Sequence, residues 1–150
     1  MAEGLKFQKF GDIEAAAVSD GVLHATYDPF RGITRAEAIK LVGRPDNGVG
    51  SVPIQVNAFI VKVGGKTIMV DTGTSNTMGP TLGHVAANLR AGGVDPATVT
   101  HVLLTHIHPD HSNGLVDEKN QPVFPNAEVL VHDNDAKFWL DREPQAADGD

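Results

Sequence analysis

The stretch His101-Val-Leu-Leu-Thr-His-Ile-His-Pro-Asp-His111 decides which fold the sequence predicts. Its first five residues are mostly apolar and predict a short buried strand, and the loop that follows holds three of the chain's seven histidines. In an extended segment the side chains of residues i and i+2 point the same way, so His106 and His108 can face one point. Asp110 and His111 follow a proline, where the chain can turn into a helix, and can face a second point nearby.

These four side chains have the chemistry of metal ligands. Neutral imidazole binds zinc at about 2.0–2.1 Å, and carboxylate oxygen binds it at about 2.0–2.2 Å. Four ligands on one loop can hold two metal ions, and two ions about 3.5–4 Å apart would bridge and activate a water molecule. A cluster of three histidines and an aspartate has no structural advantage of its own, so a metal role is favoured. The other histidines are predicted to be ordinary surface or core residues: His24, His84, His101 and His132.

Outward from this loop, the spacing of apolar residues indicates both strands and helices. Residues 54–60 alternate apolar and polar side chains, as a half-buried strand does, and Gly64-Gly65 provides a two-residue turn. Thr34 and Glu37 form the pattern of a capping box at a helix start. Strands are expected at residues 5–10, 12–20, 54–60, 66–70, 101–105 and 127–131, a loop at 21–33, and helices at 34–42, 80–91 and 133–140. This order predicts an α/β or α+β fold, with a mixed β-sheet and flanking helices.

The composition limits the classes of partner and of metal site. The chain has 150 residues, which suits one domain, and its net charge of −7 without a basic run argues against nucleic acid as a partner. Because cysteine is absent, disulfides and thiolate metal sites are excluded. No apolar run approaches the ~20 residues that cross a bilayer, and the N-terminus has no apolar signal region. We therefore expect a cytoplasmic protein that acts on a small molecule and has no membrane partner.

The motif His106-x-His-x-Asp-His111 resembles the H-x-H-x-D-H signature of the metallo-β-lactamase superfamily. Asp71-Thr72-Gly73, at the end of an expected strand, is similar to the second landmark of that superfamily. The resemblance extends to methyl parathion hydrolase-like members and covers about residues 5–142. Further similar stretches are Gly79-Pro-Thr-Leu-Gly83, Ala87-Asn-Leu89, Phe124-Pro-Asn-Ala127 and Phe138-Trp-Leu140.

The resemblance implies a role for each residue of the motif. His106 and His108 would hold the first metal ion, and Asp110 and His111 would hold the second. Asp110 would also be catalytic, because it lies near enough to exchange protons with the nucleophile or the leaving group. The implied cofactor is zinc, with two divalent ions in the intact domain.

Three further residues are implicated beyond the motif. Asp71 would orient a ligand imidazole or its loop from outside the ligand set, although an aspartate that merely ends a strand at a turn is the alternative. Trp139 and Met78 would line a substrate pocket. For Trp139, packing into the core is the alternative, and Met78 stands where methyl parathion hydrolase has an aromatic residue.

The resemblance also implies a larger fold than this sequence contains. Domains of this superfamily are αββα sandwiches of two similar halves, so residues 1–150 are expected to form a partial domain, the N-terminal half. A further histidine for each metal ion and a bridging aspartate are expected in the other half. Two ligands per ion are fewer than the three protein ligands of a typical catalytic zinc site.

The implied function is that of a metal-dependent hydrolase. A metal-bound hydroxide would attack an ester, lactone or phosphoester-type bond. The alternative is a non-catalytic metal-binding module in which two copies associate as a homodimer through an uncovered sheet face.

Overall fold

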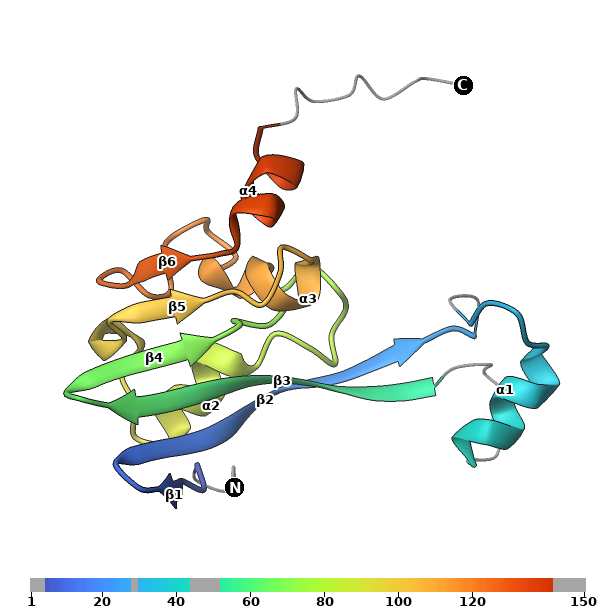
Figure 1. Ribbon diagram of the computed structural model, residues 1–150, viewed down its shortest axis with the longest axis horizontal. Coiled ribbons are helices and arrows are strands. Elements are labelled where there is room, and N and C mark those ends of the chain that lie inside the picture. Colours follow the sequence, from blue (N-terminus) through green and yellow to red (C-terminus); the bar gives the residue numbers. More distant parts are fainter. Residues whose placement is uncertain (1–4, 28–29, 44–51, 142–150) are drawn as a thin grey trace.

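The computed structural model describes residues 5–27, 30–43 and 52–141. Within these residues six strands form one sheet in the order β1-β2-β3-β4-β5-β6 (Figure 1). The strands are β1 (Gln8–Phe10), β2 (Ile13–Ala25), β3 (Val52–Val63), β4 (Lys66–Val70), β5 (His101–Leu103) and β6 (Glu128–Leu130). Strands β1 to β4 are antiparallel, whereas β4, β5 and β6 run parallel to one another. The expected mixed sheet of an α+β fold is confirmed.

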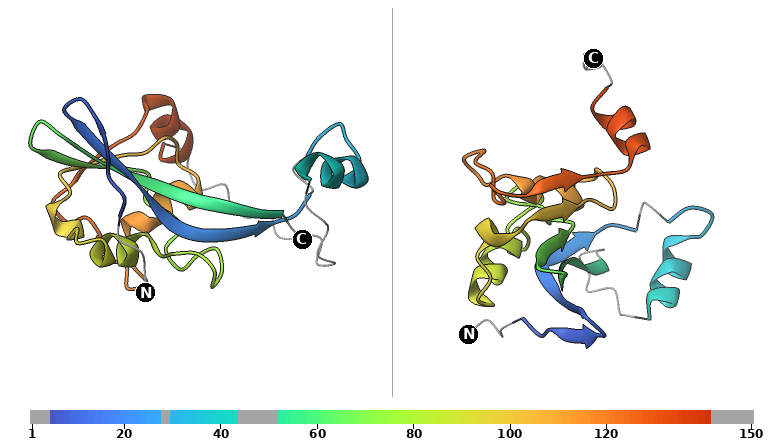
Figure 2. Two further views of the ribbon diagram at one scale, coloured as in Figure 1. Left: turned by 90° about the horizontal axis from the view of Figure 1, so that it is seen from below. Right: turned by 60° about the vertical axis from the view of Figure 1, so that its left-hand side comes forward.

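The described residues also form four α-helices and two short 3-10 helices. They are α1 (Arg35–Val42), α2 (Val85–Ala91), η1 (Pro96–Thr98), α3 (Pro109–Ser112), η2 (Asn113–Leu115) and α4 (Asp133–Trp139). Helix α2 packs against β2, and α4 stands beyond the edge strand β6 (Figures 1 and 2). The N-cap of α4 is His132, whose Nδ1 accepts from the backbone N–H of Asn134. No helix in the described ranges has the length and apolar character that crossing a membrane requires.

Helix α1 begins and ends as its sequence predicts. The Thr34 hydroxyl accepts from the Glu37 backbone N–H at 3.3 Å, and the Glu37 carboxylate accepts from the Thr34 N–H at 2.7 Å. The Thr34 backbone N–H first, and then the Thr34 hydroxyl, which donates to Oε2 of Glu37 at 2.8 Å, hold the pKa of Glu37 below its ordinary value. Gly43 ends the helix with a left-handed φ of 66°. The helix lies at the far end of the long β2–β3 ribbon (Figure 1).

The expected loop at residues 21–33 is wrong in its first part, because β2 continues to Ala25. A β-bulge between Ser19 and Gly21 lets the strand continue its pairing with β3. The register passes from the Ser19–Asn57 pair to the Gly21–Val56 pair, so Asp20 is the extra residue and Gly21 resumes the pairing. Its φ is 124°, and a Cβ on it would lie 2.0 Å from the carbonyl oxygen of Thr81. The glycine therefore permits a close backbone approach that the sequence alone does not reveal.

Helix α2 begins at Val85, five residues later than the expected start at residue 80. The preceding Gly83 has a φ of 87°, and a Cβ on it would lie 2.1 Å from the carbonyl oxygen of Ser75. Leu82 is nevertheless buried, like Val85 and Leu89. The apolar spacing thus predicted burial correctly, while the close approach of two loop segments prevents an earlier helix start.

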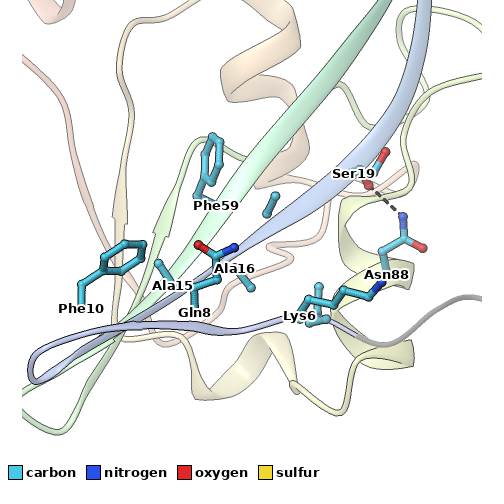
Figure 3. A pocket seen from close by; sticks show the side chains of 10 residues that line it. Lys6, Gln8, Phe10, Ala15, Ala16, Ser19, Phe59 and Asn88 are labelled. Atoms are coloured by element: carbon cyan, nitrogen blue, oxygen red, sulfur yellow. Dashed lines mark hydrogen bonds between the residues drawn. The ribbon is translucent and has the colours of Figure 1, made fainter.

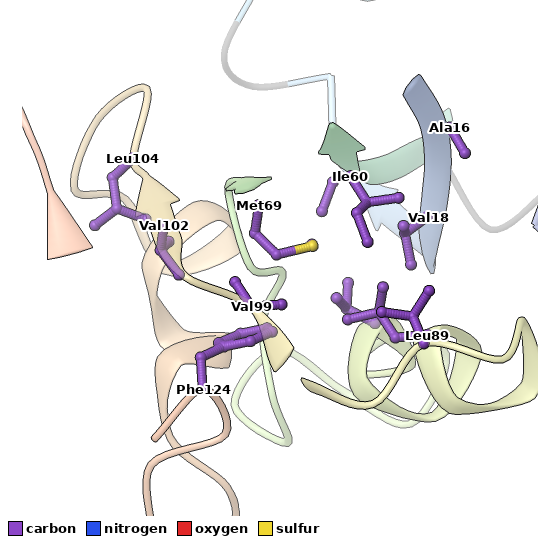
Figure 4. Packing of buried hydrophobic residues seen from close by; sticks show 12 residues of the cluster. Ala16, Val18, Ile60, Met69, Leu89, Val99, Val102, Leu104 and Phe124 are labelled. Carbon is purple, nitrogen blue, oxygen red and sulfur yellow. The ribbon is translucent and has the colours of Figure 1, made fainter. Parts of the chain in front are cut away.

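The main core lies on the face of the sheet that α2 covers (Figure 4). Alternate residues of the strands point to this face, as the pleat of a strand requires. Its buried side chains are Ala16, Val18, Ala58, Ile60, Met69, Val85, Leu89, Val94, Val99, Val102, Leu104 and Phe124. The aliphatic core expected from the small number of aromatic residues is present.

The opposite face of the sheet is apolar and exposed. The strand register aligns one row of side chains across five strands: Ala17, Phe59, Val70, Leu103 and Leu130. Phe59 is 48% exposed, Leu130 is 40% exposed and Leu103 is 38% exposed. A contiguous apolar surface of this kind marks a face that packs against another surface.

Replacement of the core residue Leu89 tests this packing. Leu89 is fully buried between α2 and the sheet, so Leu89→Ala should lower the free energy of unfolding by about 2–5 kcal/mol. Leu41→Ala is the control, because Leu41 is 76% exposed on α1 and should change stability by less than about 0.5 kcal/mol. Equal effects of the two substitutions in urea denaturation would contradict the described core.

Candidate metal centre

The predicted ligands lie where two parallel strands end. Strands β4 and β5 pair with Val70 opposite Leu103, so the residues after both strands emerge at one edge of the sheet. Asp71 follows β4, and its backbone N–H donates to the carbonyl of Leu103 at 2.9 Å. His106 lies in the loop after β5, and α3 follows that loop. This edge is where open α/β sheets place their ligands.

The histidine loop brings all four predicted ligands together. Nε2 of His106 lies 3.0 Å from Nδ1 of His108, and the rings of His106 and His111 have their centres 4.0 Å apart. Nε2 of His111 lies 3.4 Å from Oδ2 of Asp110. The donor atoms therefore face one another in pairs, His106 with His108 and His111 with Asp110.

These donors fit a divalent metal site in chemistry, but they do not complete one by themselves. Imidazole nitrogens and carboxylate oxygens bind zinc and similar ions. Among the residues that the structure describes, no group of three or more His, Asp or Glu side chains is arranged to hold a metal ion. The pairs supply two donors each, as the sequence predicts, and the assignment of the ligands stays a prediction.

Asp71 lies at the centre of the hydrogen bonds behind the ligands. It is 7% exposed, and its φ of 59° is left-handed, which is uncommon for a residue other than glycine. Its carboxylate accepts from the Thr105 backbone N–H at 2.8 Å and from His111 Nδ1 at 2.8 Å. A carboxylate only accepts, so Nδ1 of His111 carries the proton and Nε2 keeps its lone pair. This is the geometry that the orienting role expected for Asp71 requires.

Thr105 is a functional residue that the sequence analysis missed. Its Oγ1 lies 2.9 Å from Oδ2 of Asp71 and 3.0 Å from Nδ1 of His106. The single hydroxyl proton goes to the carboxylate, so the oxygen accepts from Nδ1 of His106 and leaves Nε2 of that ring unprotonated. The only feature of the sequence that could have indicated this role is the position of Thr105 between a buried strand and the first histidine.

The two residues expected to line a substrate pocket, Trp139 and Met78, lie in different parts of the structure. Trp139 is 45% exposed on α4, so its alternative as a core residue is wrong, and its ring meets that of His108 edge-on at 5.7 Å. The Ile107 backbone N–H donates to Asp135 of the same helix at 3.1 Å, which ties the loop to α4. Met78 is half-buried in the loop between β4 and α2. Trp139 therefore borders the histidines directly.

Two hollows differ in their relation to the site. A hollow of about 670 Å³ lies beside the histidine loop, with Ile107, Ser112 and Asn113 in its wall together with Val129 of β6 and the following Val131. Another hollow of about 720 Å³ lies near β1 and β2, between Gln8 and Phe59, and none of the predicted site residues lines it (Figure 3). The predicted site residues do not line the first hollow either, but it borders the histidine loop through Ile107 and Ser112.

Replacement of Asp71 tests the hydrogen bonds behind the ligands. Asp71→Asn keeps the size of the side chain but points an amide donor at other donors, so it should lower the free energy of unfolding by about 1–3 kcal/mol. It should also remove the preference of His111 for a proton on Nδ1, as measured by long-range ¹H–¹⁵N NMR of the histidine rings. Asp95→Asn is the control, because Asp95 caps η1 and asparagine caps equally well. An Asp71→Asn variant that matched this control in both measurements would refute the hydrogen bonds assigned to Asp71.

Comparison with known proteins gives the family of the chain. Residues 51–148 match the family model of the metallo-beta-lactamase superfamily. A UPF0173 metal-dependent hydrolase of Pyrobaculum neutrophilum is 38% identical over 61 residues, which are 41% of this chain and 24% of that protein.

Solved structures agree over nearly the whole chain. The hydrolase AbOPH of the beta lactamase superfamily superposes with a TM-score of 0.84 at 33% identity, over 97% of this chain and 49% of that one. AidC, a dizinc quorum-quenching lactonase, superposes with a TM-score of 0.82 at 29% identity, over 95% of this chain and 49% of that one. This chain thus spans about half the length of these two structures. From the family model and the shared fold, the chain belongs to the metallo-β-lactamase superfamily.

Proposed function

We propose that this protein is a hydrolase whose metal centre is built on the loop from His106 to His111. The single observation that carries the proposal is the pairing of four ligand-type side chains at the edge where β4 and β5 end. A purely structural role would not require three adjacent imidazole rings backed by a buried carboxylate. The metal-dependent hydrolase and the dizinc lactonase among the similar proteins support the same class of reaction.

His106 and His108 would hold one ion, and Asp110 and His111 would hold a second, with zinc as the proposed metal. Bound there, such ions would supply Lewis-acid chemistry, lowering the pKa of a water molecule towards ~7 and stabilising negative charge on the attacked centre. The ligands missing from each pair would come from residues outside those described.

The other side chains of the site have roles in proton transfer and orientation. Asp71 and Thr105 keep the protons of His111 and His106 on Nδ1, so each ring presents an unprotonated Nε2. The Asp110 side chain is 30% exposed, so its free oxygen can take a proton from a nucleophile or return it to a leaving group. Trp139 forms an apolar wall beside His108.

The proposed substrates are small molecules with an ester, lactone or phosphoester-type bond. The hollow beside the histidine loop has an apolar wall that suits the non-reacting part of such a molecule. We put lactones first among these substrates, and the support is the similarity to AidC, a quorum-quenching lactonase solved in complex with a product, an N-acyl-L-homoserine.

Metal content is the first test of the proposal. Elemental analysis of the purified protein, together with the segment that would supply the remaining ligands, should find zinc or another divalent ion, and in that context His108→Ala should lower the metal content and abolish hydrolysis. His24→Ala should leave both unchanged, because His24 is exposed on β2, away from the loop. Full metal content and activity in His108→Ala would show that the ligand assignment is wrong.

A substrate comparison tests the reaction class. The metal-loaded protein should hydrolyse N-hexanoyl-homoserine lactone faster than a p-nitrophenyl phosphotriester, as followed by proton release and by nitrophenolate absorbance. A faster phosphotriester reaction would reverse this order of substrates. No hydrolysis of either compound, or of a p-nitrophenyl ester, by the loaded protein would contradict the proposed hydrolase function.

A further inference from the structure

Asp20 is a fully buried carboxylate in the inner face of β2. Its Oδ2 accepts from the backbone N–H of Thr74 at 3.0 Å, from the Thr74 hydroxyl at 2.8 Å and from the N–H of Gly83 at 3.1 Å. Its Oδ1 accepts from the N–H of Val85 at 3.2 Å. Three of the four donors belong to the segment that connects β4 to α2, and the fourth is the backbone N–H of Val85, the first residue of α2.

An aspartate is an unexpected residue at this position. The preceding inward-facing residues of β2, Ala16 and Val18, are buried apolar side chains of the core. A buried carboxylate is costly unless hydrogen bonds replace its hydration, and within the described residues Asp20 has no basic partner. Here it satisfies two backbone N–H groups of the connecting loop and one at the start of α2, which an apolar side chain cannot do.

The segment that Asp20 binds is the one that carries Asp71. A Cβ on Gly73 would lie 2.4 Å from Oδ1 of Asp20, so the backbone of the loop rests directly against the carboxylate. On its other side the same segment is bound to the metal loop. The Thr72 N–H and hydroxyl both donate to the carbonyl of His111, at 2.8 and 2.9 Å. Residues 71–74 are therefore hydrogen-bonded to Asp20 on one side and to the backbone of His111 on the other.

We propose that Asp20 is a positioning residue of the metal centre, one that acts on His111 through the Asp71–Thr74 segment. The inference rests on the proposed metal-dependent function. The left-handed φ of Asp71, 59°, is maintained only where surrounding contacts fix the backbone. The hydrogen bonds from Thr74 to Asp20 fix that backbone three residues further along the chain. Metal ligands must be placed to within about half an ångström, so a loosened segment would weaken binding.

Cobalt binding to the full chain separates positioning from simple stability. Cobalt(II) is titrated into the wild type, Asp20→Asn and Thr74→Val, and the dissociation constant and visible spectrum are recorded at a temperature where each is folded. Asp20→Asn should weaken binding about tenfold or more and change the spectrum, because outer partners of metal ligands typically contribute 10–100-fold in affinity. Thr74→Val removes only the hydroxyl donor and should weaken cobalt binding by a smaller factor. Thr74→Ser keeps the hydroxyl and should retain wild-type binding.

Val18→Ala is the matched control. Val18 is fully buried on the same face of the same strand but belongs to the apolar core, so its truncation should lower the unfolding temperature without changing cobalt affinity. Should Asp20→Asn fail to fold, the Thr74→Val and Thr74→Ser pair decides the question. Wild-type cobalt affinity in both Asp20→Asn and Thr74→Val, or in Thr74→Val alone where the former does not fold, would overturn the inference. Absence of cobalt binding by the wild type would overturn the proposed function, and this inference with it.

Discussion

The carboxylate of Asp71 joins the segment after β4 to the histidine loop after β5, at the edge of the sheet where both strands end. Beyond the last pair, Val70 and Leu103, the two strands share one more backbone hydrogen bond, from the Asp71 N–H to the Leu103 carbonyl, and then diverge. One buried carboxylate replaces the ladder there, accepting from Thr105 after β5 and from His111 in α3. The orientation of the histidine rings depends on this group, because it decides which ring nitrogen carries the proton.

The parallel pairing of β4, β5 and β6 explains both the site and the exposed face. Parallel neighbours need crossover connections, and the two crossovers contain α2 with η1, and α3 with η2. The core lies on the face that α2 covers, while the row from Ala17 to Leu130 stays exposed on the other. One topology thus gathers the ligand loop at an edge and leaves an apolar surface beside it. The chain spans about half the length of the similar solved structures.

Local patterns predicted the elements whose hydrogen bonds are local. The capping box of α1 joins residues three apart, and the turn at Gly64-Gly65 joins adjacent strands. The spacing of the histidines likewise predicted side chains that meet within one loop, because residues two apart in an extended segment share a side. The mixed sheet followed from the order of these elements.

Contacts between separate segments decided the ends of β2 and α2 and the hydrogen-bond partners of Asp20 and Asp71. The burial of Asp20 depends on hydrogen bonds to Thr74 and Val85, 54 and 65 residues away in sequence. The continuation of β2 to Ala25 depends on its pairing with β3, and the late start of α2 depends on the close approach of Gly83 to Ser75. The hydrogen bonds of Asp71 to Thr105 and His111 cross 34 and 40 residues. The sequence by itself therefore determined which residues have the chemistry of the site and most of the strands and helices. Tertiary structure alone decided which groups orient those residues, because a hydrogen bond between distant segments leaves no periodic pattern along the chain.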